Sequence, residues 1–323
     1  MPLREIRDGT TIPLPEVDEL CLSIVMDNAI DVLMAGTEVA RRLPLRADAF
    51  ARPAPRAEHG FSALLDVRRG EARGRVLFDT GVSRDGILHN ADLMEIDLRD
   101  IRAIVLSHGH ADHTLGLAGL LGRLGPRGLP LVLHPEAYLE RKIVLPTGVE
   151  VQIPPPRRAD LRRAGVEVIE EVGPSLLVDD MVLVSGEVRR TTPFETGFPI
   201  HWARRDGTWG PDPLIRDDQC AIVNLRGKGL VLVTGCGHAG IVNTVRQAQA
   251  LTGVQRVHAV VGGFHLTGGL FERIIPDTVA ALQAIGPRYL VPGHCTGWPA
   301  ALQLARAMPE AYLPNSVGTT YIL

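Results

Sequence analysis

Most of the chain alternates between short apolar runs and polar turns. The runs Phe61–Val67 and Gly74–Phe78 flank a charged turn, a pattern that predicts a β-hairpin, and Ala221–Leu225 with Gly229–Val233 predict another. Further runs of strand length are Cys21–Met26, Ile101–Leu106, Leu131–Leu133, Met181–Val184, Val257–Val261 and Tyr289–Val291. Apolar spacing predicts helices near 91–98, 115–125, 241–249 and 276–285, which places the chain in the α/β class.

Two parts of the chain resemble each other. Gly74–Gly81 is similar to Gly229–Gly235, and each is followed by a second similar pair, Arg102–His108 and His258–His265. This weak repeat indicates two similar βα halves that send the ends of their strands to a shared edge. One domain over residues 1–323 therefore accounts for the whole length.

One long segment breaks the pattern. Thr191–Gln219 has little periodicity, and long loops inside compact domains are usually functional or disordered. Concentrated aromatic residues argue against disorder. We interpret 191–219 as an inserted loop that either lines a substrate site or contacts a second copy in a homodimer; its aromatic and histidine residues are Phe194, Phe198, His201, Trp202 and Trp209.

Composition narrows the classes of partner. Of 323 residues, 45% are apolar and the net charge is −3, with scattered basic residues balanced by acids, so no nucleic-acid surface is expected. No apolar run approaches the roughly 20 residues of a membrane span, and the polar Met1–Glu19 is not typical of a secretory signal. The four cysteines lack CxxC spacing, which suits a reducing cytosol. We expect a cytoplasmic protein that acts on a small molecule.

The strongest chemical signal follows the run Ile101–Leu106. His108, His110, Asp112 and His113 lie within six positions, and such groups are ligands for zinc, iron or manganese. At the end of a strand, His108 and His110 point to one side, while the next two ligands begin a helix and point to another. Each pair can then hold one metal ion, with the two ions roughly 3.5–4 Å apart. A capping role would explain Asp112 but none of the histidines.

The motif His-x-His-x-Asp-His after an apolar strand resembles the signature of the metallo-β-lactamase superfamily. The resemblance implies a four-layer αββα sandwich with two pseudo-symmetric halves and a site at one edge. It also implies that Asp79 orients a histidine from beneath the site, that His238 joins the first pair of ligands, and that His294 joins the second. The usual bridging Asp is not identifiable, which leaves Glu187, Cys236 and Cys295 open as ligands.

Five segments, the first of which contains this motif, together resemble a subgroup of that superfamily, the 7,8-dihydropterin-6-methyl-4-(β-D-ribofuranosyl)aminobenzene 5′-phosphate synthases. They are 107–117, 186–190, 234–243, 262–266 and 292–297. The resemblance implies chemistry on a phosphorylated or otherwise anionic small molecule. It is strong for the subgroup and weak for the substrate.

The functional prediction is a metal-dependent hydrolase or related transferase with one or two divalent ions, of which zinc fits best. Asp112 is expected to bind metal and orient water, and His265 either to act on a leaving group or to be a structural core histidine. Around a phosphate, the expected substrate contacts are Glu187, Arg189 and Arg190, unless these charged groups are only solvated. On a flat ring, the expected contacts are Phe194, Trp202 and Trp209, unless they are only hydrophobic cover for the insertion. Lactone or thioester hydrolysis, a redox protein and a signalling protein are the alternatives.

Overall fold

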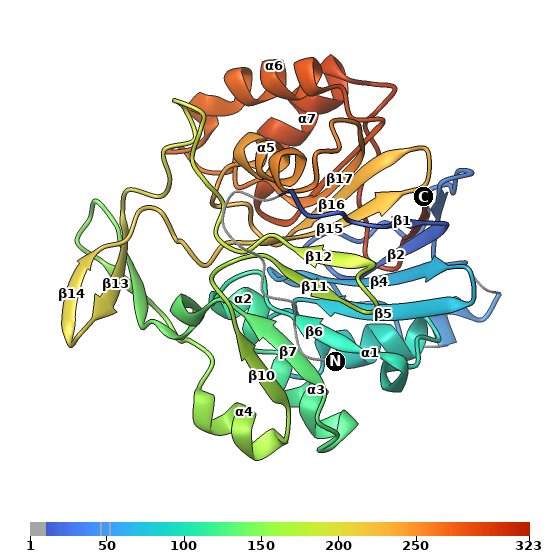
Figure 1. The fold of residues 1–323 in the computed structure, drawn as a ribbon, viewed down its shortest axis with the longest axis horizontal. Coiled ribbons are helices and arrows are strands. Elements are labelled where there is room, and N and C mark those ends of the chain that lie inside the picture. Colours follow the sequence, from blue (N-terminus) through green and yellow to red (C-terminus); the bar gives the residue numbers. More distant parts are fainter. Residues whose placement is uncertain (1–10, 46, 52) are drawn as a thin grey trace.

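Two large β-sheets face each other in the computed structural model, which describes residues 11–45, 47–51 and 53–323 (Figure 1). Residues 1–10 lie outside the described residues, and with them lies most of the segment 1–19 that we expected not to be a secretory signal. Arg46 and Arg52, between residues 42 and 59, also lie outside them. The first sheet has the order β10-β7-β6-β5-β4-β2-β19-β3. Its strands are β2 (Glu19–Met26), β3 (Ala40–Arg41), β4 (Ser62–Arg69), β5 (Ala72–Phe78), β6 (Ala103–Val105), β7 (Pro130–Leu133), β10 (Glu167–Glu170) and β19 (Thr320–Ile322).

The second sheet has the order β11-β12-β15-β16-β17-β18, with β1 paired to β15. Its strands are β1 (Glu16–Val17), β11 (Ser175–Leu177), β12 (Val182–Val184), β15 (Cys220–Leu225), β16 (Gly229–Thr234), β17 (Val257–Gly263) and β18 (Tyr289–Gly293). β15, β16 and β17 are buried along their whole length. Strands covered on both faces read as continuous apolar runs, which is why the sequence shows no alternation there.

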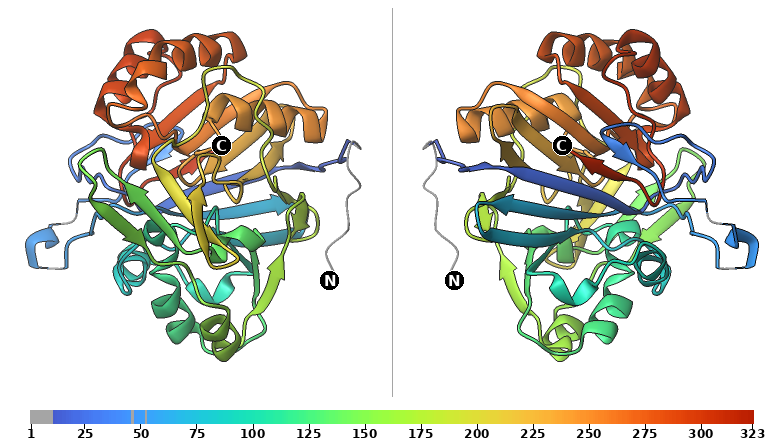
Figure 2. Two further views of the ribbon diagram at one scale, coloured as in Figure 1. Left: turned by 90° about the vertical axis from the view of Figure 1, so that its left-hand side faces the viewer. Right: turned by 90° about the vertical axis from the view of Figure 1, so that its right-hand side faces the viewer.

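Helices form the two outer layers, as Figure 1 and the side views of Figure 2 show. One apolar core lies between the two sheets. Each sheet also packs against its own helices through a further core, which makes three in all. The helices on the first sheet are α1 (Gly86–Leu93), α3 (Leu117–Leu124) and α4 (Arg158–Ala164); those on the second are α5 (Ile241–Thr252), α6 (Ile275–Ile285) and α7 (Trp298–Ala307). The predicted αββα sandwich is confirmed.

The two halves repeat one strand pattern. β4 and β5 form an antiparallel hairpin, after which β6 and β7 join β5 in parallel. In the second sheet β15 and β16 form the hairpin, and β17 and β18 follow in parallel. The repeat seen in the sequence is therefore the trace of two βα halves.

A third, smaller sheet stands beside the sandwich, with the order β14-β13-β8-β9 (Figure 1). Its strands are β8 (Arg141–Val144), β9 (Glu150–Ile153), β13 (His201–Arg205) and β14 (Thr208–Pro211). We call it the accessory sheet. The expectation of an irregular loop over 191–219 is wrong for 201–211, because β13 pairs with β8, a partner some sixty residues earlier that local periodicity does not reveal.

One helix is displaced from its predicted place. The pattern favoured a helix over 91–98, whereas α1 covers Gly86–Leu93. Ile87 and Ala91 pack on the first sheet, and Glu95 takes a left-handed φ of 58°, which ends the helical path.

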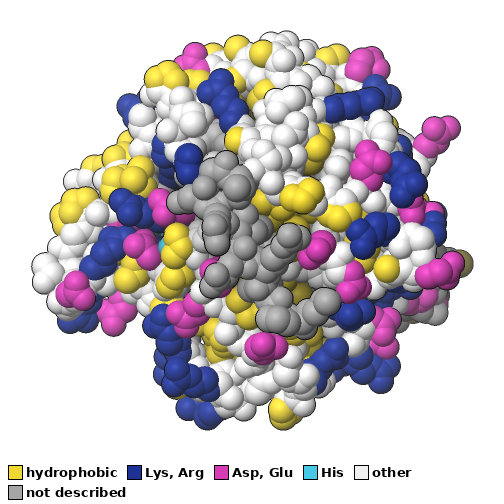
Figure 3. Space-filling view, in the orientation of Figure 1, with side chains coloured by type: hydrophobic (Ala, Val, Ile, Leu, Met, Phe, Trp, Pro, Cys, Tyr) yellow, Lys and Arg dark blue, Asp and Glu magenta, His cyan; other side chains and the backbone are white. Residues whose placement is uncertain are grey.

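The surface carries mixed charge. On the face drawn in Figure 3, Lys and Arg side chains are interspersed with Asp and Glu. None of the helices in the described part of the chain has the length and apolar character required to cross a bilayer.

A buried ion pair ties the accessory sheet to the sandwich. Arg141 of β8 donates from Nη1 to Asp217 Oδ2 at 2.9 Å, and both side chains are fully buried. The same oxygen accepts from Gly109 N at 2.7 Å, in the turn between His108 and His110. The pair therefore holds the turn that carries the predicted metal ligands.

Removing one partner of this pair should be costly. Arg141→Met leaves the Asp217 carboxylate buried without its cation, so we expect the free energy of unfolding to fall by about 3–5 kcal/mol. Urea denaturation measures it. Arg123→Met, which breaks an exposed pair with Asp92, is the control and should cost no more than about 1 kcal/mol. Equal effects of the two changes would contradict the role given to the buried pair.

Candidate metal centre

The candidate site lies where strands from both sheets end. β5 and β6 lead into Asp79 and Ser107, and β16, β17 and β18 lead into Cys236, His265 and His294. Because these strands bring their carboxyl ends to one edge, residues far apart in sequence meet there.

The first group of candidate ligands consists of His108, His110 and His238. Their ligand atoms lie within 4.8 Å of one another, and all three residues are buried. His238 Nε2 lies 3.2 Å from His110 Nδ1. The structure thus brings together the three histidines that the resemblance implied for one ion.

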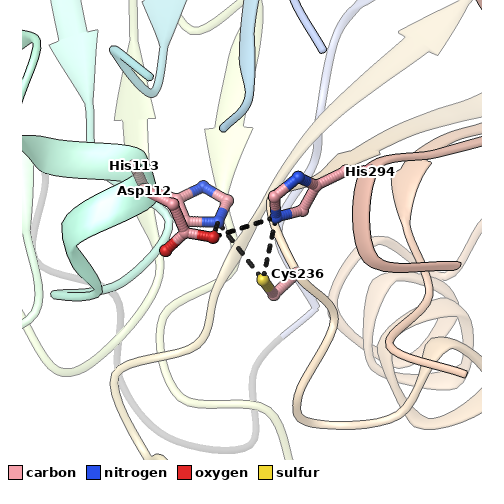
Figure 4. A group of neighbouring side chains, drawn as sticks. All are labelled: Asp112, His113, Cys236 and His294. Atoms are coloured by element: carbon pink, nitrogen blue, oxygen red, sulfur yellow. Dashed lines mark hydrogen bonds and ion pairs between the residues drawn. The ribbon is translucent and has the colours of Figure 1, made fainter. Parts of the chain in front are cut away.

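The second group consists of Asp112, His113, Cys236 and His294, shown in Figure 4. Cys236 Sγ lies 3.2 Å from His113 Nε2 and 3.3 Å from His294 Nε2, and Asp112 Oδ2 lies 3.2 Å from the latter nitrogen. Zinc bonds of 2.0–2.3 Å in tetrahedral geometry would separate neighbouring ligand atoms by about 3.3–3.6 Å. These separations fit a single tetrahedral ion.

Asp79 fixes which ring nitrogen faces the site. His113 Nδ1 donates to Asp79 Oδ2 at 2.7 Å, and Ser107 Oγ donates to the same oxygen at 2.7 Å. Ser107 Oγ is then free to accept from His108 Nδ1, 2.9 Å away. His108 therefore keeps a lone pair on Nε2, and Nε2 is also the nitrogen that His113 turns toward the second group, as in metal ligands with an oriented imidazole.

The donor chemistry fits a divalent cation. The Nε2 of His108 is buried and has no hydrogen-bond partner among the described residues. Leaving a buried acceptor unpaired costs roughly 1–3 kcal/mol, and a cation held by the first group would offset this.

Burial and charge set the protonation of the site. Burial lowers the pKa of His108, His110 and His238 well below 6.5, so these imidazoles are neutral and keep a lone pair. Burial also lowers the pKa of His113, but Asp112 and Asp79 outweigh it and raise that pKa to about 9.

The two anionic candidates of the second group are affected in opposite ways. Burial opposes ionisation of Asp112, but His113 and His294 outweigh it and hold the pKa of that carboxyl far below its usual range. Burial, with Cys295 beside it, raises the pKa of the Cys236 thiol. A cation coordinated by the sulfur would favour the thiolate.

His265 lies next to the ligands. Its ring centroid is 4.1 Å from that of His238 and 4.4 Å from that of Phe271. Burial lowers the pKa of His265 to about 3, so the ring is neutral near pH 7. Phe194 and Phe198 line the same pocket, which runs alongside His238.

Other predicted contacts are placed differently. Trp202 lies on the face of β13 opposite His201, because residues alternate across the strand, and the buried His201 is the one that contacts His110. Glu187 belongs to neither ligand group, and its 40% exposed side chain lies 3.9 Å from Arg216. Arg189 lines a small polar cavity with these two residues.

Two open questions concern Arg190 and Cys295. Arg190 is not a phosphate clamp: it donates to the backbone oxygens of Leu214 and, at 2.7 Å, His238, and so supports the turn that carries a ligand. Cys295 Sγ donates to Cys236 O at 3.2 Å, outside both ligand groups.

Several residues beside the site carry no sequence signal that marks them as part of it. His59 is exposed, stacks on His294 at a centroid distance of 4.9 Å, and has Nε2 3.7 Å from Asp112 Oδ2. Asp27, directly after β2, accepts from His294 N at 2.8 Å. His201 contacts His110 from the accessory sheet. None of these belongs to a recognisable motif, although Asp27 ends a strand as Asp79 does.

Residues 58–245 match the family model described as the metallo-beta-lactamase superfamily. The chain belongs to this superfamily. It is 31% identical over 253 residues to the 7,8-dihydropterin-6-methyl-4-(beta-D-ribofuranosyl)-aminobenzene-5′-phosphate synthase of Methanocaldococcus jannaschii, covering 76% of this chain and 83% of that protein. An uncharacterized protein of the same organism is 31% identical over 257 residues, covering 77% and 88%.

Solved structures of the superfamily share the fold. The structure of Tm1679, described as a metal-dependent hydrolase of the beta-lactamase superfamily, matches with a TM-score of 0.69 at 24% identity, over 93% of this chain and 98% of that one. The family resemblance seen in the sequence is confirmed.

Asp79 can be tested directly. Asp79→Asn places an amide where one carboxylate oxygen accepts, so His113 and His108 lose part of their orientation, and metal affinity should fall about 10–100-fold. Competition with a chromophoric chelator measures the affinity. Asp66→Asn is the control, since Asp66 binds Arg73 and Arg75 on the strands instead of a ligand. Wild-type affinity in Asp79→Asn would exclude the orienting role.

Proposed function

We propose that this protein is a metal-dependent hydrolase or related transferase that acts on a phosphorylated or otherwise anionic small molecule. The observation that carries the proposal is the pair of adjacent ligand groups whose buried lone pairs converge at one edge of the sandwich. His108, His110 and His238 would hold one ion, and Asp112, His113, Cys236 and His294 a second. Bound divalent ions lower the pKa of water towards about 7 and polarise a phosphoryl or carbonyl oxygen.

Asp112 lies where the centre meets solvent. Its side chain is 21% exposed, whereas those of His113 and His294 are fully buried. Its carboxylate can therefore accept a hydrogen bond from an attacking water while the buried ligands exclude bulk solvent. The exposed His59 beside it is placed to contact an arriving substrate.

The ligand set supports zinc for the second position. A thiolate with two imidazoles suits zinc better than manganese or magnesium, which prefer oxygen ligands. The first position, with three imidazoles, suits zinc and also iron.

The pocket beside His238 has an aromatic lining but a free volume of only about 30 Å³, so a flat ring would enter only with movement of that lining. Phe198 stacks on the His238 ring with an interplanar angle of 14°, and Phe194, Phe271 and His265 complete an aromatic lining. Arg273 also lines this pocket and offers a cation to an anionic group. The name of the Methanocaldococcus relative contains both a dihydropterin and a phosphate. We therefore retain Phe194 and His265 as proposed substrate contacts in this pocket, and Arg189 as one from the separate small cavity that Glu187 also lines.

Metal content tests the central claim. Protein purified without added metal should carry one ion per intact ligand group, measured by mass spectrometry of acid-digested samples. His110→Ala should empty the first group and His294→Ala the second, because each removes a ligand without touching the other set. His89→Ala, which removes a histidine bonded to Ala54 O, is the control.

Activity separates the functional claim from mere metal binding. Treatment with a chelator should abolish turnover in a screen of phosphomonoesters, phosphodiesters, lactones and thioesters, and zinc should restore it. A wild type that holds metal but turns over none of these compounds would leave the metal centre standing and refute the hydrolase proposal.

Phe198→Ala tests the aromatic pocket. If a flat ring of the substrate stacks on Phe198, loss of this side chain should raise KM about 5–150-fold, since stacking of a base on an aromatic ring contributes about 1–3 kcal/mol, while metal content stays unchanged. Steady-state kinetics on the best substrate of the screen measure it. Trp209→Ala removes an aromatic ring that Lys142 covers on the accessory sheet and should leave KM unchanged. An unchanged KM in Phe198→Ala would rule out this pocket as the ring site.

A further inference from the structure

A histidine of the accessory sheet touches a ligand of the first group. His201 of β13 is fully buried, and its Nε2 lies 2.9 Å from His110 Nε2. On its other side, His201 Nδ1 lies 3.0 Å from Asp212 O and 3.3 Å from Asp212 Oδ2. Both ring nitrogens of His201 are thus engaged, one by a ligand and one by an acceptor.

Only one arrangement of protons satisfies this chain of contacts with neutral rings. Asp212 O can only accept, so His201 carries its proton on Nδ1 and donates it there. His201 Nε2 is then an acceptor, and His110 must donate from Nε2. His110 Nδ1 is left with a lone pair, and this is the atom that lies 3.2 Å from His238 Nε2 within the first group.

Asp212 is itself held in place. Arg205 Nη2 donates to its Oδ1 at 2.9 Å, and Arg141 Nε lies 3.5 Å from its Oδ2. The accessory sheet contributes both arginines, from β13 and β8. The orientation of His201 is therefore set by Asp212, which two arginines of that sheet hold in place.

We propose that His201 is a positioning residue that selects the metal-binding tautomer of His110, which makes the accessory sheet part of the metal centre. The inference rests on the proposed metal site. The role of His201 differs from that of Asp79. An imidazole accepts a hydrogen bond from the ligand without adding negative charge, whereas a carboxylate raises the basicity of the ligand. His110 and His113 are thus oriented by chemically different partners.

The test compares His201→Ala with His201→Gln and with Trp202→Ala. Gln can accept from His110 Nε2 through its oxygen, and Trp202 lies on the opposite face of the same strand. Cobalt(II) is the probe, because its visible absorption reports ligand geometry. His201→Ala should weaken cobalt binding at one position about 10–100-fold and change its spectrum. His201→Gln should recover most of the affinity, and Trp202→Ala should match the wild type.

A double-mutant cycle excludes a general loss of structure. In a His110→Ala background the ligand is already gone, so His201→Ala should have no further effect on cobalt affinity. The same loss in both backgrounds, or wild-type cobalt binding in His201→Ala, would overturn the proposal. Circular dichroism checks that each variant folds, and His201→Gln, which keeps the polar side chain, decides the matter if the alanine variant does not.

The outcomes also separate this inference from the proposed function. If the wild type binds cobalt at both positions and hydrolyses nothing, the function fails and the role of His201 is still measurable. If the wild type binds no cobalt, both fall.

Discussion

The burial of several imidazoles together is the constraint on which the rest of the structure depends. Each neutral ring brings one donor and one acceptor, and each must find a partner in a place that water does not reach. On the donor side, Asp79, Ser107 and His201 accept hydrogen bonds from His113, His108 and His110. The ring nitrogens that could accept face one another across the site. This arrangement distinguishes a candidate metal centre from a polar core in which every group is hydrogen-bonded.

Close backbone approach makes this packing possible. A Cβ on Gly235 would lie 2.1 Å from Ser107 Oγ and 2.6 Å from Asp79 Oδ2, so only glycine lets the turn carrying Cys236 reach the oriented histidines. Gly109 plays the same part on the other strand end, where a Cβ would meet Ala137 O at 2.1 Å. The strand ends supply the ligands, and the glycines beside them allow both halves of the sandwich to meet at the site.

What the sequence predicted, and what it did not, follows from the range of the interactions. The motif from His108 to His113 is local, and its spacing alone predicted four ligands, which the structure brings into the two candidate groups. His238 and His294 required the family resemblance, because the strands that carry them meet the motif only in the folded sheet. Cys236 was left open as a ligand, because no spacing rule separates a cysteine ligand from an inert buried thiol; the structure places it in the second group. Trp202 was chosen over its neighbour His201 because local composition cannot reveal which face of an unpredicted strand turns inward.

The accessory sheet shows why the insertion does more than cover the site. Arg141 of β8 holds Asp217, which accepts from the backbone of Gly109, while His201 of β13 accepts from His110. Both contacts act on the same turn, one on its backbone and one on its ligand. A change in the accessory sheet would therefore alter the first group of ligands and leave the second group intact. In the second group, Asp79 accepts a hydrogen bond from the ring of His113, and Asp27 accepts one from the backbone of His294. In this chain the sandwich supplies the metal ligands, and the inserted strands set how one of them is presented.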